Sequence, residues 1–341
     1  MKHVCISGKY ETETKYIYTR KENRRSRQII IPGVPARRDT VMPRAVRTVL
    51  HALSYGGIEV DASRKLADIK KMDPMRIFYK TLDAEVYNGD YKVPIRLFFP
   101  TEEAMENGAA SGKKPPVILF FHGGGWVTES VENYQRVCAR MAQSTGQIVA
   151  SVEYRLAPEY RFPVGLMDCY AAAKAFYTNR FLLNTDPDRI TIMGDSAGGN
   201  LAAAVCMMAR DRGEFYPKKQ ILIYPALNNC YTEKSPFESV KTNGTGYLLT
   251  AEKMEDYLKL YESCPEDRNN PYFAPILEKD LRNMPDTLIL TAEFDPLRDE
   301  GEAFGECLKA AGNHVEVHRI AGAFHGYFAL GIKFLHVQES F

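Results

Sequence analysis

The sequence has no long apolar run, no strong net charge and no paired cysteines. Nothing in it approaches the eighteen or so successive apolar residues that a membrane-spanning helix needs. The charges nearly cancel, with a formal net charge of +1 at pH 7, so composition does not point to a nucleic-acid or membrane partner. Seven scattered cysteines include no CxxC pair, which favours reduced thiols in a cytoplasm over a disulfide framework.

The first residues mix charge and tyrosine and contain no apolar stretch typical of a signal peptide. Within them, RKENRRSR (20–27) is a basic cluster that could contact phosphates. On a chain that is otherwise neutral, such a run is more often a solvated surface. We therefore expect a cytoplasmic protein with no nucleic-acid partner and no membrane span.

The regular part of the chain begins near residue 84 and alternates strands with helices. In AEVYNGDYKVPIRLFF (84–99), Asn88-Gly89 separates two alternating runs, a strong hairpin signal. Six short, nearly continuous apolar runs follow, at 117–121, 148–152, 190–193, 220–223, 287–291 and 315–320. Helix-length segments separate most of them, which is typical of a parallel sheet covered on both faces. We predict an α/β fold with an eight-stranded, mostly parallel sheet.

Two segments fall outside this alternation, residues 1–80 and residues 228–275. The second contains TAEKMEDYLKLYES (250–263), in which apolar side chains recur at helical spacing. Helices that only pack against the core would explain both segments. A lid over the carboxyl edge of the sheet, where open α/β sheets bind ligands, would also explain them. We favour a lid, because both segments interrupt an otherwise complete core at 81–227 and 276–341.

The segment ITIMGDSAGGN (190–200) carries the GxSxG pattern between a predicted strand and a helix-forming run. A nucleophile elbow requires that strand–turn–helix context, which exposes a serine hydroxyl at the tip of a tight turn. A glycine-rich helix start is the alternative. We interpret Ser196 as a nucleophile. Asp195 is a candidate hydrogen-bonding brace for the elbow, although a short polar turn residue would also suit that position.

A serine hydroxyl needs a general base, and a histidine held by a carboxylate is the usual solution. In this class of fold the acid and then the histidine follow the serine along the chain. Of the later histidines, His314 and His318 lie within the last predicted strand and His336 lies near the end of the chain. His325 comes just past that strand, where loops carry catalytic groups, and is our candidate base.

The candidate acid is Asp295, which follows the buried run 287–291. Asp299 is the competitor, and Pro296 favours a helix that begins directly after Asp295 and contains Asp299 in its first turns. Asp295 could also be a helix cap only. We choose Asp295, because a residue at the carboxyl edge of the sheet can face His325 in the neighbouring loop.

The run HGGGW (122–126) follows the first parallel strand and contains the only tryptophan of the chain. When a serine attacks an ester carbonyl, backbone N–H groups stabilise the developing oxyanion, and glycines leave room for the substrate. In this fold one donor is the residue after the nucleophile, here Ala197, and another comes from the HGGG loop.

We assign the donors of this loop as Gly124 and Gly125, with Gly123 as a third contributor. A flexible turn is the alternative, but it explains neither His122 nor Trp126, which flank the glycines. His122 is expected to anchor the loop rather than to carry a proton.

Taken in order, the motifs closely resemble the hormone-sensitive-lipase family of esterases, the bacterial family IV group, in its GDSAGG branch. The resemblance rests on HGGGW (122–126), YRLAPE (154–159), FP (162–163), Asp168, GDSAGGN (194–200), YP (224–225), DPLRDEG (295–301) and HGY (325–327). It implies an α/β-hydrolase core, a helical cap built from the N-terminus and the insertion after the sixth strand, and a Ser196–His325–Asp295 triad. It also implies hydrolysis of short- to medium-chain carboxylic esters without a cofactor. Members of the family often dimerise through the last strand, so a homodimer is compatible with the resemblance.

The predicted function is therefore that of a serine carboxylesterase acting on a small-molecule ester. Deacetylation of amides or acetylated sugars by the same triad is an alternative, because the discriminating contacts belong to the cap. A small-ligand receptor is less favoured, since the resembling plant hormone receptors lose the histidine that is present here as His325. In HVEVH (314–318), His314, Glu316 and His318 could share one face as three metal ligands. Alternation with Val315 and Val317 on a half-buried strand explains the same pattern without a metal, so we predict no metal.

Overall fold

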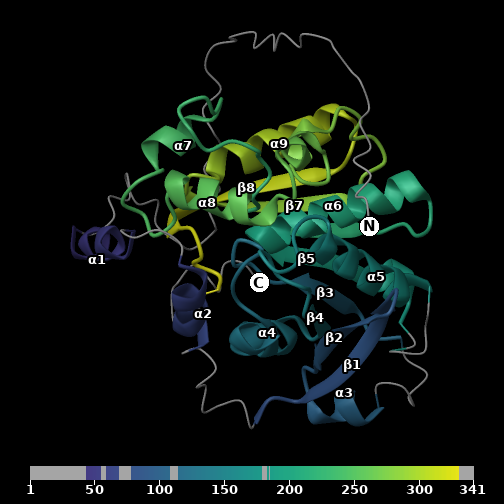
Figure 1. Cartoon of the computed structure of the whole chain (residues 1–341). Helices are drawn as coiled ribbons and strands as arrows, with labels where there is room; N and C mark the ends of the chain where they lie inside the picture. The colour runs from purple at the N-terminus through teal and green to yellow at the C-terminus, as the bar shows by residue number, and fades with distance from the viewer. Residues whose placement is uncertain are drawn as a thin grey trace, which may run out of the picture. The chain divides into compact units, whose positions relative to one another are not determined.

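The computed structural model describes residues 44–54, 59–68, 78–107, 114–178, 183 and 185–329 (Figure 1). The basic cluster at 20–27, most of the predicted N-terminal segment and His336 lie outside these residues. Residues 37–341 belong to one compact unit, and the following description concerns that unit.

The core is one eight-stranded sheet. Its strands are β1 (Thr81–Asn88), β2 (Tyr91–Phe98), β3 (Val117–Phe121), β4 (Ile148–Val152), β5 (Ile190–Asp195), β6 (Lys219–Ile223), β7 (Asp286–Phe294) and β8 (Val315–Phe324). They lie in the order β1-β2-β4-β3-β5-β6-β7-β8. β2 is antiparallel to β1 and β4, and the remaining neighbours are parallel. The prediction of an eight-stranded, mostly parallel sheet is confirmed.

The hairpin predicted at Asn88-Gly89 joins β1 to β2. Asn88 pairs with Tyr91, so Gly89 and Asp90 form a two-residue turn. Gly89 has a φ of +59°, a left-handed conformation that glycine adopts without the steric cost of a Cβ atom. The turn residues therefore set the register of the strand pair.

Helices cover both faces of the sheet (Figure 1). α4 (Val131–Thr145) packs on one face, and α5 (Val164–Thr178), α6 (Ala197–Arg212) and α9 (Arg298–Ala310) pack on the other. Successive residues of β3 belong alternately to the two cores, with Ile118 on the α4 side and Leu119 on the α6 side. This alternation is the two-residue period of a strand, and burial on both faces explains why the sequence of β3 is apolar throughout.

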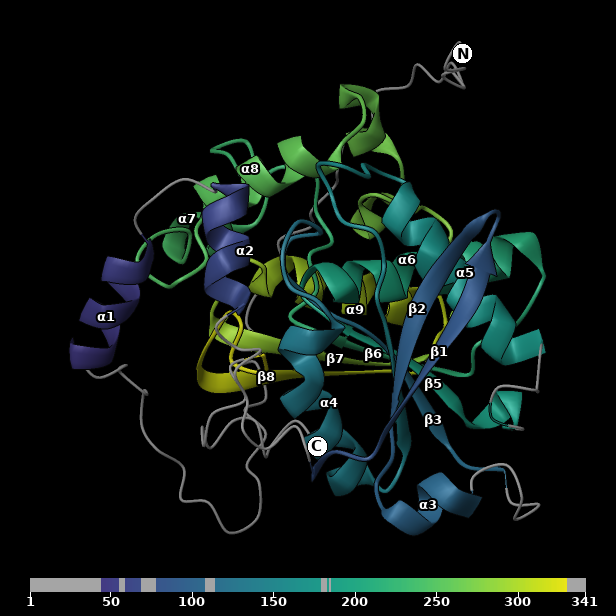
Figure 2. The same ribbon diagram turned by 60° about the horizontal axis from the view of Figure 1, so that its bottom comes forward.

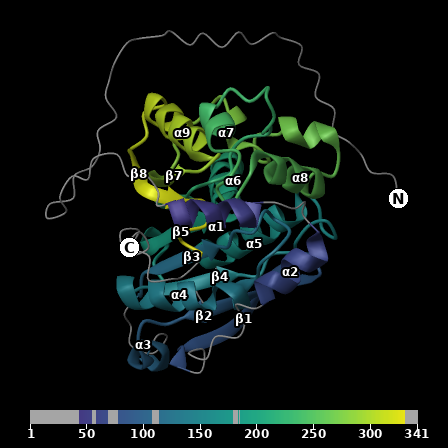
Figure 3. The same ribbon diagram turned by 90° about the vertical axis from the view of Figure 1, so that its left-hand side faces the viewer.

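Four further helices lie close to one another, beyond one end of the strands (Figure 1). They are α1 (Arg44–Ser54), α2 (Val60–Asp68), α7 (Glu238–Thr242) and α8 (Ala251–Tyr261). Figures 2 and 3 show the same grouping from two other directions. The remaining elements are α3 (Glu102–Asn107) and the 3-10 turns Pro187–Arg189, Pro265–Asn269 and Pro275–Leu277. The helix predicted in 250–263 is confirmed as α8, and its Met254, Leu258 and Tyr261 are buried.

Contacts of single residues show where two of these helices, α1 and α2, lie. Leu50 of α1 packs with Tyr247 and Phe324, the residue before His325. From α2, Arg64 donates to the carbonyl of Val127, just past the glycine loop, at 2.9 Å. The helices therefore reach the edge of the sheet where the candidate functional residues were predicted.

Two observations concern membrane-spanning helices and disulfide bonds. Among the helices that the structure describes, none combines the length and apolar character needed to cross a bilayer. The six described cysteines are free thiols, and Cys138, Cys169 and Cys206 are buried.

The turn between β5 and α6 depends on a close backbone approach at Gly198. A Cβ atom there would lie 2.0 Å from the carbonyl oxygen of Phe121 and 2.6 Å from that of His122. We expect Gly198→Ala to lower the free energy of unfolding by more than about 4 kcal/mol, measured by urea denaturation. Gly146→Ala is the control, because Gly146 has open space but a φ of +66°, and should cost only about 1 kcal/mol. Equal losses in the two variants would contradict the steric explanation.

Candidate active site

Three loops that leave the carboxyl ends of parallel strands bring Ser196, Asp295 and His325 together. They follow β5, β7 and β8 directly, and the carboxyl ends of parallel strands meet at one edge of a sheet. The Oγ atom of Ser196 lies 2.8 Å from Nε2 of His325. Nδ1 of His325 lies 2.7 Å from Oδ2 of Asp295. Both distances are hydrogen-bond distances, so the side chains form a continuous relay.

Ser196 occupies a strained position at the tip of the turn. Its φ of +55° and ψ of −119° lie in a region that side chains rarely adopt, and such strain is concentrated at functional sites. Its backbone N–H donates to Ile223 at 2.9 Å, and its carbonyl accepts from Asn200 and Ala226. These bonds hold the backbone, while the serine remains 8% exposed at the amino end of α6. The turn therefore fixes the hydroxyl within reach of His325.

Asp295 is fully buried, whereas His325 retains 8% exposure. The other carboxylate oxygen of Asp295, Oδ1, accepts from the N–H of Leu297 at 2.8 Å, so both oxygens of Asp295 are hydrogen-bonded. Asp299 points elsewhere: its oxygens accept from the N–H of Ser239 and from Nε of Arg298. Of the two acids weighed from the sequence, Asp295 is the one that faces the histidine.

The histidines of β8 do not join this relay. Nε2 of His318 lies 3.2 Å from Oε2 of Glu316 on the same face of the strand, as an alternating polar face requires. Within the described ranges, no group of three or more histidine, cysteine, aspartate or glutamate residues is placed to hold a metal ion.

The glycine loop turns sharply beside the serine. Gly124 and Gly125 have φ values of +106° and +61°, and a Cβ on Gly125 would lie 2.4 Å from the ring of Tyr257 in α8. Among the hydrogen bonds of the described residues, none uses the N–H groups of Gly124, Gly125 or Ala197. The N–H of Gly123, by contrast, donates to Oδ1 of Asp195 at 2.9 Å. Among the described residues, three of the four predicted donors thus have no hydrogen-bond acceptor, whereas the N–H of Gly123 is directed at a carboxylate.

The residues that flank the glycines anchor the loop on aromatic side chains. His122 stacks on Tyr154 with ring centres 4.4 Å apart, and the Tyr154 hydroxyl donates to the His122 carbonyl at 2.7 Å. Trp126 stacks on Tyr261 of α8 with centres 4.5 Å apart and planes 3° from parallel. Both ends of the loop are therefore held by large buried rings.

Asp195 connects the glycine loop to the elbow. In addition to Gly123, it accepts from the hydroxyls of Tyr134 at 2.8 Å and Tyr224 at 3.2 Å. Burial raises the pKa of Asp195 to about 6, although these hydrogen bonds and the nearby His325 act in the opposite direction. The sequence did not reveal these two tyrosines as partners of Asp195. Tyr224 stands in the YP motif and its ring centre lies 4.7 Å from that of His325, so this motif was the available signal.

A further buried carboxyl group, Glu300 of α9, was not identified as a functional residue from the sequence. Its Oε1 accepts from the N–H of Leu227 at 2.7 Å, the N–H of Asn228 at 3.3 Å and the hydroxyl of Tyr231 at 2.7 Å. Burial raises the pKa of Glu300 to about 8. Glu300 belongs to the DPLRDEG motif and ties the segment after β6 to the helix that follows Asp295.

Comparison with known proteins gives consistent matches. A family model described as the alpha/beta hydrolase fold matches residues 118–329. The chain is 35% identical to an arylesterase of Saccharolobus solfataricus over 73% of this chain and 77% of that protein. It is 34% identical to an ethyl acetate hydrolase of Pseudomonas putida over 71% and 73% of the two chains. Among solved structures, a hyperthermophilic esterase of the archaeon Pyrobaculum calidifontis superposes with a TM-score of 0.76 at 36% identity, covering 88% of this chain and 95% of the other.

The raised pKa of Asp195 predicts a pH-dependent stability difference. A folded-state pKa of about 6, above the ordinary value of 3.8, means that the contribution of this group to stability falls as pH rises from about 4 to 6. Asp195→Asn has no such proton. Urea denaturation should show the stability of this variant relative to the wild type rising by about 3 kcal/mol between pH 3.5 and 7.

Wild type and variant are measured in the same buffers at each pH, so that effects common to the two chains cancel in the difference. A difference that stays constant with pH would show that the buried carboxyl group of Asp195 does not titrate in this range.

Proposed function

Since the chain belongs to the alpha/beta hydrolase fold family, in its hormone-sensitive-lipase group, we propose that it is a carboxylic ester hydrolase acting through Ser196, His325 and Asp295. The observation that carries the proposal is the relay of 2.8 Å and 2.7 Å hydrogen bonds through the three side chains. A receptor that only binds its ligand has no need of this relay. The deacetylase alternative uses the same relay, and is separated from ester hydrolysis by substrate tests below.

The proposed reaction has two stages. Ser196 Oγ attacks the ester carbonyl carbon while its proton passes to Nε2 of His325, and the carbonyl oxygen becomes an oxyanion. The oxyanion then collapses, His325 returns the proton to the departing alcohol, and an acyl-serine remains. Water attacks the acyl-serine carbonyl carbon while His325 Nε2 takes one of its protons. The C–Oγ bond then breaks, His325 returns that proton to Ser196 Oγ, and the carboxylic acid is released. Asp295, buried and bonded to Nδ1, keeps the imidazole in the required tautomer and stabilises the imidazolium.

The proposed oxyanion site consists of the N–H groups of Gly124, Gly125 and Ala197. Each such donor is worth roughly 3 kcal/mol of barrier in enzymes where one was removed. The amino end of α6, which begins at Ala197, adds the favourable end of a helix dipole. We propose that Gly123 contributes through its bond to Asp195, by holding the loop in place, and His122 and Trp126 through the stacking described above.

We propose that α1 and α2, the helices described within the predicted N-terminal segment 1–80, form the cap over this site together with residues 228–275. Tyr257 of the insertion covers Gly125, Leu248 approaches Gly326, and Leu50 of α1 packs beside Phe324. Large side chains this close to the reacting groups support short- to medium-chain acyl substrates. The Pseudomonas putida relative, named as an ethyl acetate hydrolase, supports the same preference. The cytoplasmic location and the homodimer stay predictions.

Ser196→Ala should reduce kcat for p-nitrophenyl butyrate at least about 10⁴-fold, since it removes the nucleophile. The loss should appear in kcat, with the circular dichroism spectrum unchanged. Retained turnover by a folded Ser196→Ala protein would refute the assignment of the nucleophile.

Substrate class is tested with the wild-type enzyme. Among p-nitrophenyl acetate, butyrate, octanoate and dodecanoate, kcat/KM should be highest for the acetate or butyrate and should drop for the dodecanoate, because the cap limits the space beside the serine. Acetylated xylo-oligosaccharides and p-nitroacetanilide serve as comparison substrates. A higher kcat/KM for either of these would favour the deacetylase alternative.

A further inference from the structure

The loop that carries Asp295 follows an irregular end of its strand. β7 pairs regularly with β8 as far as Ala292, after which the register shifts before Phe294. Irregular pairing loosens the ladder that normally holds a strand end. The loop that contains Asp295 therefore begins where fewer hydrogen bonds from the sheet hold the backbone. Hydrogen bonds from other groups hold it instead.

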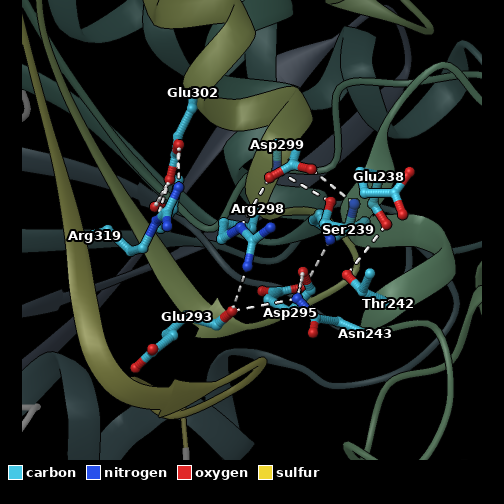
Figure 4. A network of polar contacts seen from close by, with 12 residues as sticks. Glu238, Ser239, Thr242, Asn243, Glu293, Asp295, Arg298, Asp299, Glu302 and Arg319 are labelled. Carbon is cyan, nitrogen blue, oxygen red and sulfur yellow. Dashed lines mark hydrogen bonds and ion pairs between the residues drawn. The ribbon is translucent and has the colours of Figure 1, made fainter. Parts of the chain in front are cut away.

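Asn243, directly after α7, supplies part of that support (Figure 4). Its Nδ2 atom donates to the carbonyls of Glu293 and Asp295, each at 3.2 Å. Asn243 is only 6% exposed, so neither carbonyl can readily exchange this amide for water. One side chain of the insertion thus bridges the carbonyl groups of Glu293 and Asp295, the residues on either side of Phe294.

Ser239 of α7 holds the other side of the same loop (Figure 4). Its hydroxyl donates to the carbonyl of Pro296 at 2.8 Å and accepts from the N–H of Asp299 at 3.1 Å. Its own N–H donates to Asp299 Oδ2 at 2.7 Å. Because Ser239 is fully buried, α7 is joined to the start of α9 by three hydrogen bonds without competition from solvent.

Arg298 completes the clamp. Its Nη1 atom donates to the carbonyl of Glu293 at 3.0 Å, the same carbonyl that accepts from Asn243, and its Nε donates to Asp299 at 2.8 Å. The backbone of 293–299 is therefore bonded both by its own arginine and by two residues of the insertion. The carboxylate of Asp295, held at 2.7 Å from His325, projects from this clamped segment.

We propose that Asn243 and Ser239 are positioning residues, which act through the backbone of Asp295 to set its carboxylate against His325. The inference rests on the proposed ester hydrolysis and adds a second role for the insertion. By this inference α7 supports the acid of the relay, while α8 covers the glycine loop through Tyr257. The insertion is then a structural part of the catalytic centre as well as its cover.

Asn243→Ala tests the proposal with p-nitrophenyl butyrate as substrate. We expect kcat to fall about ten- to a hundredfold, the scale of a misplaced catalytic group. KM should change less than about twofold, because Asn243 is buried and its amide is bonded to the backbone of the Asp295 loop. The acid side of the kcat/KM profile should also move to lower pH, since a displaced carboxylate stabilises the imidazolium less. Unchanged kcat, or a loss confined to KM, would overturn the proposal.

A double-mutant cycle separates positioning from a general structural effect. In an Asp295→Ala background, Asn243→Ala should lower kcat by less than about twofold, because the group through which it acts is gone. The same loss in both backgrounds would mean that Asn243 acts independently of Asp295, which contradicts the inference.

Two further variants guard against a folding defect. Thr242→Ala is the matched control in α7, since Thr242 is exposed and its hydroxyl bonds only to Glu238 within the same helix, and it should leave kcat unchanged. If Asn243→Ala does not fold, Ser239→Ala takes its place in the double-mutant cycle. This variant removes one hydroxyl with little change in volume, and it should lower kcat when Asp295 is present and not when Asp295 is replaced by alanine. Failure of the proposed function would look different, because wild-type protein would then lack ester turnover altogether.

Discussion

Two successive hydrogen bonds, from Ser196 to His325 and from His325 to Asp295, are the interaction on which the rest of the site depends. They join residues on three separate loops, so they form only if the ends of β5, β7 and β8 lie at the same edge of the sheet. The parallel order of β5, β6, β7 and β8 provides that arrangement. The buried acid Asp295 is as important to the relay as Ser196, because a carboxylate away from solvent interacts strongly with the imidazole that faces it.

Buried carboxyl groups recur as connectors around this relay. Asp195 joins the glycine loop to the elbow through one backbone N–H and two tyrosine hydroxyls. Glu300 joins the segment after β6 to α9 in a similar way. Burial raises the pKa of both groups, which is the energetic cost of placing an acid where its hydrogen bonds are not weakened by water. The hydrogen bonds of these groups fix the geometry of the loops, but burying the two acids lowers the free energy of unfolding at neutral pH.

The insertion contacts the site at two separate points. Tyr257 lies over Gly125, and Asn243 and Ser239 hold the backbone around Asp295. The segment that we propose as part of the cap is therefore also hydrogen-bonded to the backbone of Asp295. If both proposals hold, a change of sequence in the insertion alters the reaction rate as well as the choice of substrate, and variants made to change acyl preference should be compared by kcat and KM separately.

The sequence by itself determined the sheet, the hairpin, helix α8 and the short set of candidate side chains, because these follow from local patterns: apolar runs, a turn dipeptide, helical spacing and glycines around a serine. Tertiary structure alone decided which neighbours those side chains have. It showed Tyr134 and Tyr224 on Asp195, directed the N–H of Gly123 at the same carboxylate, and turned Asp295 rather than Asp299 toward His325. The contacts of Asn243 with the Asp295 loop span fifty residues of chain. No local period encodes a contact between distant segments, since it arises only when packing brings their backbones together.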